Sequence, residues 1–213
     1  MQHQAGRIIT EGSNIKYFID TEFIEDGITI DLISIGIVCE DGREYYAQSV
    51  EFDHRKASEW VKENVLIPLL MCPWAQSGPE GISGLYRTDR AYHKAHGGQC
   101  VDQQRGLVHN CSWRTREQIK RNILSFMDVE AYGKPELWGY YSAYDHVAFC
   151  QLFGTMMGLP KGFPMYTRDI KQLCDSLGNP RLPEQGKDEH NALQDARWVR
   201  EAYHFLMGSE PYH

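Results

Sequence analysis

Five side chains that could bind metal ions and move protons lie at the edges of apolar segments, in three separate parts of the chain. Asp20 and Glu22 end one apolar run, and Asp145 stands near the start of a helical pattern. His190 and Asp195 stand near the start of the last helical pattern. Carboxylates held against a core need compensating charge. Two divalent cations supply that charge and support phosphodiester chemistry, so the pattern predicts a two-metal hydrolytic site.

The pair Asp20 and Glu22 has the spacing that a shared cation requires. Residues two apart on a strand point to the same side, so both carboxylates can reach one ion. Carboxylate oxygens suit Mg²⁺, with Mn²⁺ as a substitute, better than zinc. A second pair of this type, Asp128 and Glu130, follows a predicted helix instead of ending a strand. We therefore expect the second pair to lie in a solvated loop.

His190 and Asp195 can share a site only if the histidine precedes the helix that carries the aspartate. Five steps along a helix separate two side chains by about 140°. His190 is therefore expected at or before the helix start, where its imidazole could accept a proton from water as a general base. Asp145 has a structural alternative, because an acid in the first helical turn also interacts favourably with the helix dipole.

The elements that must position these residues alternate between strands and helices. Apolar runs and turn signals predict five strands, and apolar residues at steps of three and four predict the main helices. Asp53 is expected to cap the first helix, with Trp60 on its apolar side and its end near Pro68. The expected strands cover residues 15–19, 32–38, 44–50, 137–141 and 164–168, and the longer helices cover residues 60–66, 115–127, 143–156 and 192–206. This order predicts an α/β fold with a mixed five-stranded sheet flanked by helices on both faces.

The length of 213 residues fits one domain. We expect a loose tail over residues 1–14 and a single domain over residues 15–213, with an insertion at about residues 73–112. The insertion is rich in glycine and histidine and is longer than a compact domain usually tolerates as a plain loop, so we expect a lid or a small subdomain. A zinc site and a plain loop both stay open for its His and Cys residues, which are His93, His96, Cys100, His109 and Cys111.

Composition excludes several classes of protein. Apolar residues make up 42% of the chain and charged residues 24%, which is usual for a soluble protein, and no apolar run is long enough to cross a membrane. The six cysteines form no CxxC pair, which favours a reducing, cytoplasmic location. The net charge of −7 repels nucleic acid at long range, so binding of RNA would depend on local surface and on bound cations.

The motifs Asp20-Thr21-Glu22-Phe23 and Ala143-Tyr144-Asp145-His146, with His190 and Asp195, resemble the DEDDh group of 3′-to-5′ exonucleases. Longer segments are more similar to the RNase AS family of exoribonucleases, first known from mycobacteria. These segments are residues 18–27, 32–38, 40–47, 113–119, 143–148, 150–152 and 190–198. The resemblance implies an RNase H-like fold and a Mg²⁺-dependent exoribonuclease. It also implies a homodimer that releases nucleoside 5′-monophosphates, with a leaning towards adenylate-rich single-stranded RNA.

The resemblance also assigns roles to single residues. The four metal-binding acids of the family fall on Asp20, Glu22, Asp145 and Asp195, and its general base falls on His190. The position just after the first acid, which receives the terminal nucleotide, falls on Thr21 and Phe23. Two alternatives remain at this stage. One is an exonuclease acting on DNA or small oligonucleotides, and the other is a non-catalytic nucleic-acid-binding module with the same fold.

Overall fold

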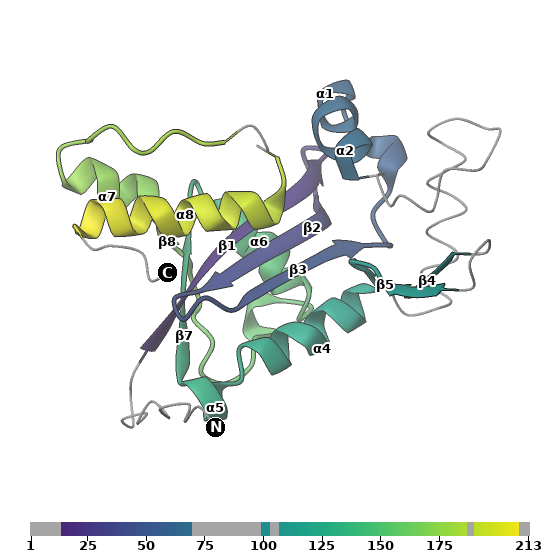
Figure 1. Ribbon diagram of the computed structural model, residues 1–213, viewed down its shortest axis with the longest axis horizontal. Coiled ribbons are helices and arrows are strands. Elements are labelled where there is room, and N and C mark those ends of the chain that lie inside the picture. Colours follow the sequence, from purple (N-terminus) through teal and green to yellow (C-terminus); the bar gives the residue numbers. More distant parts are fainter. Residues whose placement is uncertain (1–13, 70–98, 103–106, 187–189, 209–213) are drawn as a thin grey trace.

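A six-stranded mixed sheet forms the centre of the computed structural model, which describes residues 14–69, 99–102, 107–186 and 190–208 (Figure 1). The strand order is β6-β3-β2-β1-β7-β8. The strands are β1 (Asn14–Glu25), β2 (Ile30–Cys39), β3 (Glu44–Ser49), β6 (Trp113–Arg114), β7 (Lys134–Gly139) and β8 (Arg168–Asp169). The predicted α/β class is confirmed, and the arrangement is compatible with an RNase H-like fold. The prediction of five strands was wrong by one, because the two-residue strand β6 is too short to leave a pattern in the sequence.

Strand β1 lies in the middle of the sheet and carries the first two acids. It pairs antiparallel with β2, which pairs antiparallel with β3, so the first three strands form the predicted meander. On its other side β1 pairs parallel with β7. Alternate residues of β1 therefore face opposite layers of helices, as a strand buried on both sides requires.

Helices cover both faces of the sheet. One face packs on α4 (Arg116–Phe126) and α6 (Ala143–Gln151), where Tyr17 and Ile19 meet Ile123 and Phe149. The other face packs on α7 (Ile170–Ser176) and α8 (Ala192–Met207). On that face Phe18 of β1 meets the α8 seam, and Figure 1 shows α8 in yellow lying across the strands. The neighbours Asp20 and Glu22 share the α8 side, because they alternate with Ile19 and Thr21.

The segment after β3 differs from its prediction in two ways. Asp53 caps only the short 3₁₀ turn η1 (His54–Lys56), whereas Ser58 caps the helix that follows by accepting a hydrogen bond from the Val61 N–H. That helix runs through α1 (Glu59–Val61), a turn of π geometry η2 (Lys62–Leu66) and α2 (Ile67–Leu69). Its buried side is made by Val65, Leu66 and Leu69. Trp60 was expected on that side, but its side chain is 53% exposed.

The remaining helices follow their capping residues closely. Thr115 and Gln118 form a capping box at the start of α4, and Asn191 caps α8. Gly208 ends α8 in the left-handed conformation that glycine favours. The predicted helix from residue 143 ends earlier than expected, and Met156 lies in a separate 3₁₀ turn, η3 (Met156–Gly158). The short helix α5 (Val129–Tyr132) links α4 to β7.

Part of the predicted insertion forms a two-stranded antiparallel sheet of β4 (Gln99–Asp102) and β5 (Leu107–Asn110). The predicted tail, apart from Asn14 in β1, and most of the insertion lie outside the described residues. His93 and His96 lie outside them as well, and the side chains of Cys100 and His109 are not described, so the zinc hypothesis stays a prediction. No helix in the described ranges is long and apolar enough to cross a membrane.

Candidate active site

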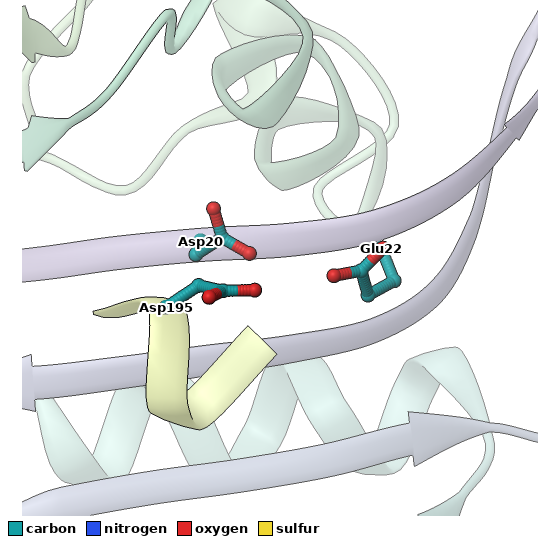
Figure 2. Close-up of side chains that lie close together, drawn as sticks. All are labelled: Asp20, Glu22 and Asp195. Atoms are coloured by element: carbon teal, nitrogen blue, oxygen red, sulfur yellow. The ribbon is translucent and has the colours of Figure 1, made fainter. Parts of the chain in front are cut away.

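Three of the predicted acids meet between β1 and the first turn of α8. Asp20, Glu22 and Asp195 each offer a carboxylate oxygen, and these oxygens lie within 4.8 Å of one another. Figure 2 shows the first two side chains rising from β1 and the third coming from the start of α8. The strand spacing and the helix start therefore bring together residues that are 175 positions apart in the chain.

Burial and mutual repulsion make this cluster electrostatically costly. Burial raises the pKa of Asp20 well above its usual range, and the charges of Asp145, Glu22 and Asp195 raise it further. The pKa of Glu22 rises to about 8 for the same two reasons, with Asp195 and Asp145 as the charged neighbours. Among the described residues, no cationic side chain contributes to either shift. Such a group of carboxylates is stabilised by a bound cation, and its all-oxygen donor set fits a hard divalent ion.

Asp195 is held by two donors from the segment that precedes α8. Its Oδ1 accepts a hydrogen bond of 2.6 Å from Nε2 of Gln185, and its Oδ2 accepts one of 3.0 Å from the backbone N–H of His190. The side chain of Asp195 is 7% exposed, so these contacts fix the direction of both oxygens. Gln185 itself is exposed and reaches back across ten residues. Its contact with Asp195 was not predicted, since no periodic pattern relates a loop glutamine to a helix.

Asp145 reaches the site from the opposite side of the sheet. It lies in the first turn of α6 and is 6% exposed. Its Oδ1 accepts hydrogen bonds from the backbone N–H of Thr21 at 2.8 Å and from the Thr21 hydroxyl at 2.5 Å. Burial raises the pKa of Asp145 to about 6 although these two hydrogen bonds lower it. Asp145 does not belong to the group of three within 4.8 Å, but its charge is the largest electrostatic influence on Asp20.

The first turn of α6 is itself anchored to the sheet. Ser142 donates its backbone N–H to Oδ2 of Asp169 at 2.9 Å, and the other oxygen of Asp169 caps α7 through the Lys171 N–H at 2.7 Å. Asp169 ends β8, beside β7. The short strand at this edge of the sheet therefore fixes the turn that carries Asp145.

His190 lies two residues before the start of α8, as its spacing from Asp195 required. Its backbone adopts a positive φ of 70°, a conformation that is uncommon outside glycine. The imidazole ring packs edge to face against the indole of Trp60, with ring centroids 4.7 Å apart. Trp60 thus borders the site, and its position in a helical pattern gave no sign of this.

The other predicted positions differ in their surroundings. Thr21 is buried, with both of its donors directed at Asp145, so the described contacts of its side chain serve that acid. Phe23 is half-buried and packs edge to face on Tyr144, with ring centroids 5.7 Å apart. Binding of the terminal nucleotide by Thr21 and Phe23 stays a prediction.

The second acidic pair is solvent-exposed, as expected, but it lies at the start of α5 and not in the loop that its context predicted. Asp128 caps α5 and accepts hydrogen bonds from the backbone N–H groups of Glu130 and Ala131. Both acids of the pair are exposed. The same three-residue pattern therefore places two carboxylates on one side of β1 and forms a helix cap after α4.

Comparison with known proteins agrees with this geometry. Residues 15–207 match the model of the family described as the 3′-5′ exoribonuclease Rv2179c-like domain. The chain is 42% identical over 183 residues to the 3′-5′ exoribonuclease Rv2179c of Mycobacterium tuberculosis H37Rv, a match that covers 86% of this chain and 88% of the relative. The 3′-5′ exoribonuclease MT2234.1 of M. tuberculosis CDC 1551 matches with the same identity and coverage. The chain therefore belongs to the family of Rv2179c-like 3′-5′ exoribonuclease domains.

Proposed function

We propose that this chain is a 3′-5′ exoribonuclease that shortens single-stranded RNA one nucleoside 5′-monophosphate at a time, at the centre built from β1, α6 and α8. The observation that carries this proposal is the meeting of Asp20, Glu22 and Asp195 within 4.8 Å. The charge of Asp145 contributes to the raised pKa of Asp20, and His190 donates its backbone N–H to Asp195. Membership of an exoribonuclease family supports the same reaction.

The four acids would hold two Mg²⁺ ions, for which Mn²⁺ would substitute. When bound, two such ions would activate a water molecule and stabilise the departing 3′-oxygen. Asp20 would be a central ligand, because one of its carboxylate oxygens lies within 4.8 Å of oxygens of Glu22 and Asp195, and the charge of Asp145 also raises its pKa. Gln185 and the His190 N–H would orient Asp195, as hydrogen bonds to metal ligands commonly do.

His190 would accept the proton of the attacking water. It lies two residues before α8, and its backbone N–H donates to Oδ2 of Asp195, which ties this residue to the acid cluster. The edge contact with Trp60 limits rotation of the ring. Thr21 and Phe23, which directly follow Asp20 and flank Glu22, would receive the terminal nucleotide, with the Phe23 ring available for stacking on a base.

Three further properties belong to the proposal. The resemblance to the RNase AS family supports a preference for adenylate-rich RNA and a homodimer. Cysteines without a disulfide in the described part of the chain support a reducing, cytoplasmic location, and they are Cys39, Cys111, Cys150 and Cys174. Sedimentation velocity would test the homodimer, with a species of twice the chain mass expected and a monomer at all concentrations opposing it.

A single degradation experiment tests the reaction. A 5′-labelled oligoadenylate RNA and its DNA twin are incubated with the protein in Mg²⁺, in Mn²⁺ and in EDTA, and the products are separated by length. We expect a ladder that shortens from the 3′ end, that needs a divalent cation and that forms faster on RNA. Equal rates on both strands would indicate an exonuclease without sugar selection. No shortening with any cation would contradict the proposal and favour a binding module.

A further inference from the structure

Gly36 in the middle of β2 faces the same layer as the acid cluster. It is the partner of Asp20 in the register of β1 and β2, and of Tyr46 in the register of β2 and β3. Residues paired across neighbouring strands point to the same face of a sheet. A side chain at position 36 would therefore project toward α8, beside the carboxylate of Asp20.

The space above Gly36 is filled by the backbone at the start of α8. A Cβ atom built on Gly36 would lie 2.1 Å from the carbonyl oxygen of Ala192, 2.3 Å from its carbonyl carbon and 2.4 Å from the nitrogen of Leu193. All three are backbone atoms, so no rotation of a side chain relieves the overlap. The φ angle of Gly36 is not in the left-handed region, so the strand conformation alone does not require glycine. The close approach of α8 does.

This contact fixes the distance between β2 and the helix turn that carries Asp195. Ala192 is the first residue of α8, and Asp195 lies three residues later in the same turn. Ordinary van der Waals contact begins at 3.4 Å, so any side chain at position 36 would push the Ala192 carbonyl away by about 1.3 Å. The carboxylate of Asp195 would move with its turn, away from Asp20 and Glu22. Metal sites tolerate changes of only about 0.2 Å in their ligand distances.

We infer that Gly36 is a positioning residue that sets the separation of Asp195 from Asp20 and Glu22, and thereby the affinity of the centre for divalent cations. The inference rests on the proposed function, because it assumes that the cluster binds cations. It assigns a role in catalysis to a residue with no functional group, which sequence motifs of acids and histidine cannot reveal.

The test compares Mn²⁺ binding by the wild-type protein and by Gly36→Ala, measured by isothermal titration calorimetry. We expect the variant to bind Mn²⁺ at least about 10-fold more weakly, as disturbed ligand positioning usually causes. Its kcat on oligoadenylate should fall by about 100-fold, the usual effect of a 1 Å misplacement. The matched control is Val199→Ala, which removes core packing from α8 one turn further along. That variant should be less stable than wild type but should bind Mn²⁺ within about 2-fold of it, because it removes atoms from the core and pushes nothing against the first turn of α8.

Three outcomes separate the possibilities. Wild-type affinity for Mn²⁺ in a folded Gly36→Ala protein overturns the inference. Equal loss of affinity in Gly36→Ala and Val199→Ala also overturns it, because the effect then follows from lower stability. Failure of the wild-type protein to bind Mn²⁺ contradicts the proposed function itself.

A second variant tests the inference if Gly36→Ala does not fold. Asn191→Ala removes the side-chain oxygen that accepts hydrogen bonds from the N–H groups of Leu193 and Gln194, so the first turn of α8 loosens without a new atom against β2. We expect weaker Mn²⁺ binding in this variant, by a smaller factor than in Gly36→Ala. Unchanged affinity would overturn the inference.

Discussion

Replacement of Asp20 by asparagine is expected to stabilise the cation-free protein while it abolishes hydrolysis. Asp20, Glu22 and Asp195 have oxygens within 4.8 Å of one another. Two full charges at that distance repel each other by about 3 to 4 kcal/mol at an effective dielectric constant of about 20. Partial protonation of Asp20 and Glu22, whose pKa values are both raised, reduces this repulsion at pH 8. We therefore expect Asp20→Asn to raise the free energy of unfolding by about 2 kcal/mol at pH 8 in EDTA, relative to wild type.

The gain in stability from Asp20→Asn depends on pH, as the raised pKa values of the cluster require. The folded-state pKa values of Asp20, Glu22 and Asp145 are raised above their usual values of 3.8 or 4.5, the last two to about 8 and about 6. An acid whose pKa is raised in the folded state stabilises the fold when it is protonated. That stability is fully present below about pH 4 and is lost as pH rises through the folded pKa values. The wild-type protein in EDTA should therefore lose stability from pH 5 to pH 8, and Asp20→Asn should lose less.

Differential scanning calorimetry at pH 5 and pH 8, in EDTA and in Mg²⁺, measures this directly. A gain of about 2 kcal/mol raises the Tm of a domain of this size by about 4 to 8 °C. Saturating Mg²⁺ should reverse the order, because only wild type gains binding energy, about 2.7 kcal/mol at 100 times Kd. Glu201→Gln is the control, since it removes an exposed carboxylate from α8 and should change stability by less than about 0.5 kcal/mol. An Asp20→Asn protein that is no more stable than wild type at pH 8 in EDTA would refute the reasoning.

Four further predictions concern single side chains. Thr21→Val keeps the backbone donor to Asp145 but removes the hydroxyl, so kcat on RNA should fall by about 10-fold or more, and wild-type turnover would contradict this role. Asp128→Asn changes the second acidic pair, which caps α5, and should leave kcat within about 2-fold of wild type while it lowers stability by about 1 kcal/mol or less. His190→Ala should reduce kcat by about 10² to 10⁴, the range of general-base catalysis, and should retain more activity than Asp20→Asn, an order that single-turnover assays would confirm or reverse. Trp60→Ala removes the indole edge packed on the imidazole ring and should lower kcat more than Trp60→Phe does, whereas equal rates in the two variants would exclude a positioning effect of the ring.

The site residues that could be predicted from the sequence share one property, which is a fixed relation to a regular element. Asp20 and Glu22 occupy alternate positions of a buried strand, and their convergence on one side follows from strand geometry. Asp195 flanks the apolar seam of α8, and the helix period alone placed His190 before the helix start. Periodicity therefore gave both the elements and the direction of these side chains.

The parts that could not be predicted depend on contacts between distant segments. Trp60 was assigned to the helical pattern of Val61, Val65 and Leu66, yet its side chain is exposed and its ring meets His190. Gln185 lies in a loop without a pattern, and only the folded structure shows its amide on Asp195. The importance of Gly36 comes from the helix backbone above it, which no property of β2 itself reveals. Strand β6 is too short to produce alternation, and its pairing with β3 depends on the fold around it.

The number of Mn²⁺ ions bound in the presence of adenosine 5′-monophosphate tests the central claim most directly. Electron paramagnetic resonance would count the ions and report whether they interact. Our prediction is two ions per chain with the broadened, coupled signal of neighbours about 4 Å apart, and loss of that coupling in Asp20→Asn. One isolated ion per chain, or a coupled pair that persists without Asp20, would contradict it.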